Sequence, residues 1–158
     1  MTRLIHLTII VLICSLLQPS VASGQDEPEK KPWKGKLGDG TEITEIELQG
    51  IIEKHKIWLD SKGEQGARAD FSGANLSDVD LSGTNLNRAI LTKANLTVAN
   101  LTKAKLIEAD LSHAELINTN LREATLLNAD LKEAYLLWAD LRESDLRKIN
   151  FRSANLRN

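Results

Sequence analysis

The sequence is poor in the residues that most catalytic and cofactor sites use. It has a single cysteine, Cys14, and three histidines among 158 residues. It contains no glycine-rich phosphate loop, no CxxC pair and no HExxH zinc motif. Cys14 lies in a segment that we expect to be removed, so the mature chain would have neither a disulfide nor a thiol nucleophile. We therefore expect no enzymatic activity, no cofactor and no metal site.

Aromatic residues and excess charge are also scarce. Aromatic residues make up 4% of the chain against 42% hydrophobic residues, so the core must be mainly aliphatic. The 20 basic and 22 acidic residues nearly balance. This balance excludes the strong positive field of a general nucleic-acid-binding protein, and we expect no nucleic acid as a partner.

The N-terminal segment 1–24 is typical of a secretory signal peptide. A positively charged start is followed by an apolar run from Leu4 to Leu17 and then by small residues. A membrane-spanning helix needs roughly 20 apolar residues, and this run is shorter, which argues against the alternative of a retained anchor. We expect cleavage after Ser23 or Gly24, a secreted or periplasmic protein, and no stable membrane span after cleavage.

Residues 25–43 have the composition of a tether. They include Pro28 and Pro32, a mixed run of Glu and Lys, and three glycines. Proline and glycine among charged residues are typical of linkers. We therefore predict a flexible linker over this range.

An α-helix is predicted to begin at Thr44. Thr44 and Glu47 have the spacing of a capping box, and Ile43 and Leu48 are placed to form a hydrophobic staple at the helix entry. Apolar residues then recur at steps of three and four, as on one face of a helix. This predicted stripe consists of Leu48, Ile51, Ile52, His55, Trp58 and Leu59.

Gly63 is the expected C-terminal stop, so we predict that the helical segment covers 44–63. His55 lies beside Trp58 and could be read as a ligand or a base. No second histidine, cysteine or carboxylate cluster accompanies it at metal-ligand spacing. We interpret His55 as a packed side chain with one nitrogen bonded locally.

From residue 69 onward a leucine or phenylalanine recurs at every fifth position, eighteen times in all. On an α-helix these side chains would spread around the cylinder, and on a flat strand they would alternate between two faces. Only a chain that turns a corner in every repeat points all of them inward. We therefore predict an all-β solenoid of about 4.5 coils over 69–158. Its predicted core ladder consists of Phe71, Leu76, Leu81, Leu86, Leu91, Leu96, Leu101, Leu106, Leu111, Leu116, Leu121, Leu126, Leu131, Leu136, Leu141, Leu146, Phe151 and Leu156.

Repeats such as ANLSD, ADLSH and ADLRE closely resemble the pentapeptide-repeat family. The resemblance covers 69–158 and implies that family's right-handed quadrilateral β-helix. The stretch HKIWLDSKGEQGARADFSG also resembles a leader that precedes the repeats in some members, which implies that the 44–63 helix caps the first coil. Some members dimerise through their C-terminal coils, so a homodimer is open here, with Ile149 as an alternative plug of that end.

The Asp and Asn residues that precede the ladder positions form columns with a spacing of twenty residues. A row of carboxylates could suggest a metal or catalytic site. Ile90, Lys105 and Tyr135 occupy the same position, however, so no chemistry can depend on the whole column. We interpret these Asp and Asn side chains as hydrogen-bond acceptors for the turn backbone.

Two groups of outward residues are apolar. Ile107 and Leu127 stack on one side of the predicted solenoid, and the second group lies on the opposite side. In this second group Ile117 and Leu137 are twenty residues apart and so stack on that side, with Tyr135 and Trp138 close by. Large exposed apolar groups mark contact sites. We predict a protein-contact patch formed by the four residues of the second group, with ordinary packing between coils as the alternative.

These features favour a non-catalytic, exported scaffold for protein–protein interaction, whose partner is an unknown protein or envelope component. The alternative is a mimic of DNA that binds a topoisomerase, as some pentapeptide-repeat proteins do. Such mimicry requires a strongly acidic surface and a cytoplasmic location. From Asp70 onward the chain has twelve acidic and eleven basic side chains, which argues against mimicry, as the signal peptide does.

Overall fold

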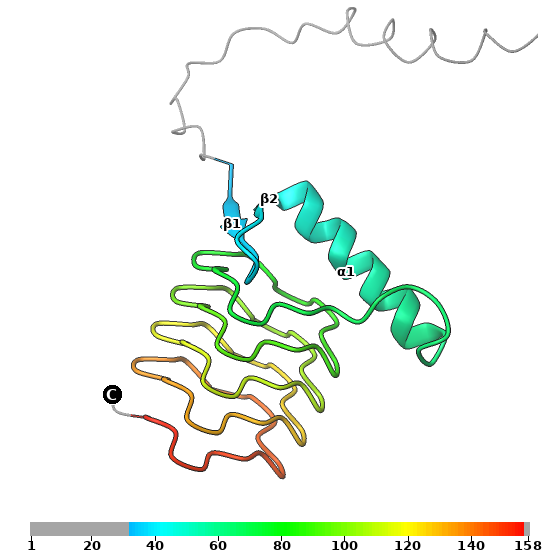
Figure 1. The fold of residues 1–158 in the computed structure, drawn as a ribbon. Coiled ribbons are helices and arrows are strands. Elements are labelled where there is room, and N and C mark those ends of the chain that lie inside the picture. The colour runs from blue at the N-terminus through cyan, green and yellow to red at the C-terminus, as the bar shows by residue number, and fades with distance from the viewer. Residues whose placement is uncertain (1–31, 157–158) are drawn as a thin grey trace, which may run out of the picture. The chain divides into compact units, whose positions relative to one another are not determined.

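The computed structural model describes residues 32–156 (Figure 1). The chain forms strand β1 (Lys34–Lys36), strand β2 (Glu42–Thr44) and helix α1 (Glu45–Asp60), and then winds into a solenoid. The predicted signal peptide and the linker residues 25–31 lie outside the described residues. Within 32–156 no helix is long and apolar enough to cross a membrane.

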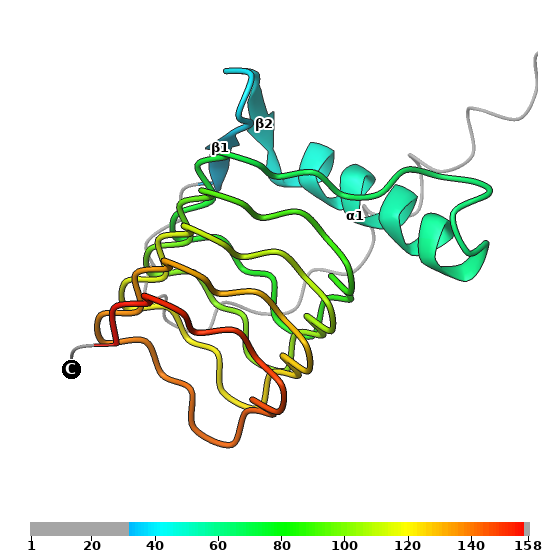
Figure 2. The ribbon, with the colours of Figure 1, turned by 60° about the horizontal axis from the view of Figure 1, so that its bottom comes forward.

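The solenoid is held together by parallel bridges between residues twenty positions apart. Asp70 pairs with Ile90 at one end, and Tyr135 pairs with Asn155 at the other. Each bridge is formed by two backbone hydrogen bonds of ordinary length. In the first, Phe71 N–H donates to the Ile90 carbonyl oxygen at 2.8 Å and Ile90 N–H donates to the Ala69 carbonyl oxygen at 3.0 Å. The chain thus returns to the same side after every twenty residues, and Figure 2 shows the resulting stack. This confirms the solenoid predicted from the period of five.

The ladder side chains fill the interior, but not along its whole length. Phe71 and every ladder leucine up to Leu136 are at most 1% exposed. The last four positions depart from the prediction, because no further coil covers them among the described residues. Leu141, Leu146 and Phe151 are only partly buried, and Leu156 is 48% exposed.

Each repeat turns its corner in the same way. The second residue after every ladder position from Phe71 to Phe151 has a positive φ, between 55° and 66°. One residue before the ladder position, Asp or Asn accepts a hydrogen bond from the backbone two residues on, as in the 2.9 Å bond from Ser72 N–H to Asp70 Oδ1. Bonds with Ser72 lower the pKa of the Asp70 carboxyl. The predicted role of these side chains in the turns is confirmed.

The prediction of a flexible linker is wrong for residues 34–43. β1 and β2 pair antiparallel, with Lys36 opposite Glu42, and Lys36 exchanges two backbone hydrogen bonds with Asn75 at 2.7 and 3.0 Å. Gly38 lets the backbone of the hairpin lie close to the backbone of the solenoid. A Cβ on Gly38 would lie 1.9 Å from the carbonyl oxygen of Ser72, so only glycine lets the hairpin lie this close to the solenoid.

Helix α1 begins as predicted and ends three residues earlier than predicted. Thr44 is the N-cap and forms the full capping box with Glu47, and this bonding lowers the pKa of the Glu47 carboxyl. After Asp60 the chain makes a Schellman turn, in which Gly63 has φ 95° and donates to the Trp58 carbonyl oxygen at 2.8 Å. Lys62, with φ 57°, holds the left-handed position of this turn, and the predicted stop, Gly63, follows it outside the helix.

Candidate interaction surface

The twenty-residue spacing sorts the outward side chains into columns, and three columns on one side of the solenoid carry large apolar groups. Backbone bonds fix these columns next to one another: Val98 N–H donates to the Ile117 carbonyl oxygen and Asn118 N–H to the Leu137 carbonyl oxygen, both at 2.9 Å. We call this surface the apolar face and define it by Val98, Ile117, Tyr135, Leu137 and Trp138.

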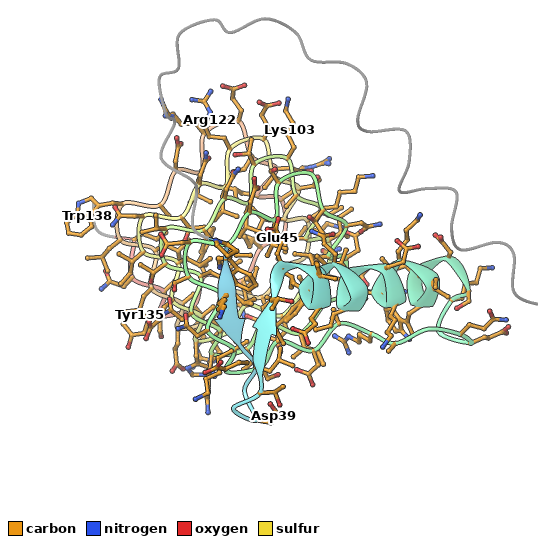
Figure 3. The ribbon with its side chains drawn as sticks, turned by 90° about the horizontal axis from the view of Figure 1, so that it is seen from above. Asp39, Glu45, Lys103, Arg122, Tyr135 and Trp138 are labelled. Carbon is orange, nitrogen blue, oxygen red and sulfur yellow. The ribbon has the colours of Figure 1, made fainter. Side chains whose placement is uncertain are left out.

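The apolar face is open to solvent. Trp138 is 61% exposed, Val98 51% and Tyr135 49%, while Ile117 and Leu137 are half-buried between them. Figure 3 shows Tyr135 and Trp138 projecting on the same side of the solenoid, away from α1. The structure thus brings the four residues of the predicted patch to one side. Sequence reasoning missed Val98, although its distance of two twenty-residue steps from Trp138 places both in one column.

Val98 and Trp138 occupy backbone positions that disfavour them. Both stand at the corner of a repeat, with φ 62° and 55°. A β-branched or bulky side chain is a rare occupant of this left-handed region, whereas asparagine tolerates it. Asn118, which lies between them in the same column, has φ 55°. Burial inside the chain cannot be the reason for the two apolar residues, because both are more than half exposed.

Other sides of the solenoid carry ion pairs within the chain. Ion pairs join successive coils between Arg88 and Glu108 at 2.8 Å and between Lys103 and Glu123 at 3.5 Å. Figure 3 places Lys103 and Arg122 on a different side from Tyr135 and Trp138. The side that holds the apolar face has no basic residue within its described segments, and its acidic residues are Asp78 and Glu115. These segments are 74–78, 94–98, 114–118, 134–138 and 154–156.

A hollow of about 690 Å³ lies at the C-terminal end of the described solenoid. Trp138 borders it and so links it to the apolar face. Beside the hollow, an ion pair and hydrogen bonds with Arg142 lower the pKa of Asp140 to about 2. Ile149, the alternative plug, is half-buried and packs against the core. The hollow is lined by Leu136, Trp138, Ala139, Asp140, Leu141, Arg142 and Leu156.

Residues 32–156 contain no group of three or more His, Cys, Asp and Glu side chains that could hold a metal ion. His113 pairs with Glu133 across one coil step at 3.2 Å. His55 is fully buried and accepts a hydrogen bond from Ala69 N–H, in agreement with its interpretation as a packed side chain.

Comparisons with known proteins agree with this geometry. The family model of pentapeptide repeats matches with eight copies over residues 69–106, 99–136 and 134–158. Because these matches cover more than half of the chain, the chain belongs to the pentapeptide-repeat family. Proteins of this family are generally structural and interaction scaffolds, and no catalytic family was found. A comparison with curated protein sequences gave no match.

The solved structures that share the fold include two pentapeptide repeat proteins from cyanobacteria. The crystal structure of the pentapeptide repeat protein Rfr23 from the cyanobacterium Cyanothece 51142 is 42% identical, with a TM-score of 0.54 over 56% of this chain and 60% of that one. HetL, a pentapeptide repeat protein involved in heterocyst differentiation regulation in Nostoc sp. strain PCC 7120, is 34% identical, with a TM-score of 0.51 over 51% of this chain and 38% of that one. These neighbours imply a right-handed β-helix for the solenoid. The chain spans less than two thirds of the length of either protein.

Proposed function

We propose that this chain is an exported, non-catalytic scaffold that binds a partner protein through its apolar face. The observation that carries the proposal is the exposure of Val98 and Trp138 in a left-handed backbone conformation. Holding a residue other than glycine there costs on the order of 1–3 kcal/mol. Packing within this chain offsets only part of that cost, because more than half of each side chain faces solvent. Burial against a partner would offset it.

The charges around the apolar face indicate which charges the partner's contact surface should carry. Asp78 and Glu115 are exposed on this side and no described basic residue balances them. A partner whose apolar contact residues are flanked by Lys or Arg complements this surface, and the charges would favour the correct orientation during association. The scaffold role common in the pentapeptide-repeat family supports a protein partner rather than a small molecule.

Photo-crosslinking tests the surface directly. A photoreactive phenylalanine analogue at Ile117 would capture the partner in intact cells, while the same analogue at Lys93 serves as a control on another side of the solenoid. The double variant V98N/W138N should abolish the adduct at Ile117, and K93N, a change at another corner position with φ 60°, should not. Equal adducts from both sides, or an adduct that V98N/W138N leaves unchanged, would contradict the proposal.

Export is a separate part of the proposal and rests on the composition of segment 1–24. Fractionation of cells that express a C-terminally tagged chain should recover a shortened protein outside the cytoplasm, with a new N-terminus after Ser23 or Gly24. Recovery of the uncleaved chain in the cytoplasm would contradict export. That result would also reopen the alternative of a topoisomerase-binding DNA mimic.

The two ends of the solenoid complete the proposal. We infer about 4.5 coils over 69–158, capped at the N-terminal end by α1 together with the β1–β2 hairpin. The twenty-residue bridges and the burial of the first ladder residues support this arrangement.

At the other end, the hollow and the exposed Leu156 support a homodimer through the C-terminal coil. Sedimentation of the wild type and of L156D should show a dimer only for the wild type, and a wild-type monomer at all concentrations would contradict it.

A further inference from the structure

His55 lies at the junction between α1 and the solenoid. Its side chain is fully buried and stacks on Trp58, with ring centroids 5.6 Å apart and an interplanar angle of 14°. Its Nδ1 accepts a hydrogen bond from Ala69 N–H at 3.1 Å, just before the first ladder residue, Phe71. An imidazole nitrogen that accepts a hydrogen bond carries no proton, so the folded state requires neutral His55 with its proton on Nε2.

Within residues 32–156 no carboxylate pairs with the ring of His55, and the one group that favours its protonation is the backbone carbonyl of Asn87. Nε2 is buried and has no hydrogen-bond partner among the described residues. On α1 itself the flanking charged residues, Glu53, Lys54 and Lys56, are all exposed. The segment that follows the helix contributes Arg68, whose guanidinium lies over the Trp58 ring at 5.9 Å.

The first coil also offers His55 no counter-ion. Asp70 is bonded to Ser72, and Arg88 pairs with Glu108. Burial lowers the pKa of His55, the Arg68 charge lowers it further, and the backbone carbonyl of Asn87 acts in the opposite direction. Protonation of the ring would therefore bury an unpaired charge and turn the Nδ1 acceptor into a donor that faces Ala69 N–H.

We propose that His55 is an acid-operated latch, which holds the C-terminal half of α1 on the solenoid while neutral and releases it when protonated. The N-terminal half of the helix is attached differently. Leu48 packs with Ile43, and the hairpin bonds to Asn75 through its backbone, so these contacts do not depend on a titrating side chain. Release therefore begins around His55 and Trp58, with the hairpin still in place. This inference does not depend on the partner proposed for the apolar face.

The direction of the pH dependence follows from linkage. The folded state holds His55 neutral, and the opened state lets it titrate near its ordinary pKa of about 6.5. The latch is therefore fully effective above that pH and weakens as the pH falls below it. Between pH 7.5 and pH 5.5 the equilibrium constant for opening should rise about tenfold, because the opened state takes up one proton that the closed state does not.

Amide hydrogen exchange measured by NMR on the full chain tests the latch. The protection factor of the Ala69 amide, corrected for the intrinsic effect of pH, should fall about tenfold between pH 7.5 and pH 5.5. The Asn100 amide, bonded to the Val79 carbonyl oxygen at 2.8 Å, provides an internal reference that should not respond. An unchanged Ala69 protection factor in the wild type would overturn the proposal.

Two variants separate the latch from a merely structural role. H55N keeps an amide oxygen that can accept from Ala69 N–H and cannot titrate, so its Ala69 protection should be independent of pH. H113N removes the half-buried histidine of the solenoid and should respond as the wild type does. A folded H55N that loses protection in acid, or an H113N that does not, would overturn the proposal.

If H55N does not fold, titration of the His55 imidazole in the wild type tests the latch. The imidazole ¹⁵N shifts of His55 in the wild type should report protonation over the same pH range in which Ala69 loses protection. If Ala69 becomes exposed while the His55 ring is still neutral, another group drives the opening and the latch is wrong. If the ring takes up its proton while Ala69 stays protected, protonation does not release the helix, and the latch is equally wrong.

Discussion

The two ends of the solenoid are built from the same repeat and differ sharply in burial. The first four ladder residues, Phe71 to Leu86, are at most 1% exposed, although no coil precedes them. At the other end Leu141, Leu146 and Phe151 are partly buried and Leu156 is 48% exposed. The repeat directs each ladder side chain inward. Whether that side chain is also buried from solvent depends on what covers the coil.

The covering contacts explain the difference. At the N-terminal end β1 bonds along Asn75, Trp33 Nε1 donates to the Ser77 carbonyl oxygen at 2.9 Å, and α1 is joined to the start of the first coil through His55 and Ala69. At the C-terminal end the described residues leave a hollow instead. The two ends thus provide a covered and an uncovered version of one structural unit.

Truncation of one ladder leucine at each end should give the largest contrast. L86A removes a fully buried side chain and should lower the free energy of unfolding by about 2–5 kcal/mol, because a cavity remains. L156A removes a side chain that is already half exposed and should cost less than about 1 kcal/mol. Urea unfolding followed by circular dichroism measures both. Equal losses would mean that the end coils are equally covered.

The hairpin can be tested by adding a single methyl group. In G38A the new Cβ would overlap the Ser72 carbonyl oxygen, so the hairpin must move away, at a cost of about 1–3 kcal/mol. G50A is the matched control, because a Cβ at Gly50 in α1 meets nothing within 4 Å. It should stabilise the helix by about 0.5–1 kcal/mol. The same unfolding experiment measures both, and a G38A variant as stable as the wild type would show that the hairpin does not cover the first coil.

The contrast between the ends also explains what the sequence could predict. A side chain repeated every fifth residue stays dry in one kind of structure, so the solenoid and the ladder followed from spacing alone. The helix start followed from Thr44 and Glu47, because capping is a local interaction. The hairpin did not, because its strands have three residues each and its glycines resemble those of a linker. Their role depends on Ser72 and Asn75, which are far away in the sequence.

The candidate surface was predictable to the same extent. Spacing of twenty placed Ile117 and Leu137 on one side and Trp138 beside them. The left-handed φ at Val98 and Trp138 was not predictable, because the corner position accepts many residue types along this chain. Glycine at Gly73 and Gly83 and asparagine at Asn118 and Asn128 were the local signals. The conformational cost that supports the binding proposal therefore became visible only in the structure.

Loss of the N-cap should have a smaller effect at the covered end. T44A removes the side chain that accepts from Glu47 N–H and should lower the free energy of unfolding by about 1 kcal/mol. T97A, a change on the outer surface of the solenoid, should stay within about 0.5 kcal/mol of the wild type. If T44A is as stable as T97A in urea, α1 contributes little to the stability of the covered end.

Lowering the pH should give the smallest difference between the ends, measured as a loss of melting temperature. Bonds and charge from Arg142 and Arg147 lower the pKa values of Asp140 and Asp145 from 3.8 to about 2. The ionised carboxylates are favoured in the folded state, so their contribution is complete above about pH 4 and is lost as the pH falls from 3.8 towards 2. Both ion pairs lie at the surface, with Arg142 and Arg147 exposed, so the effect on the melting temperature should be small. D140N/D145N should lose less of its melting temperature between pH 5 and pH 2.5 than the wild type does. D39N, in the hairpin at the covered end, removes one such group and should change this loss less. A D140N/D145N protein with the wild-type pH dependence would show that these pairs do not stabilise the uncovered end.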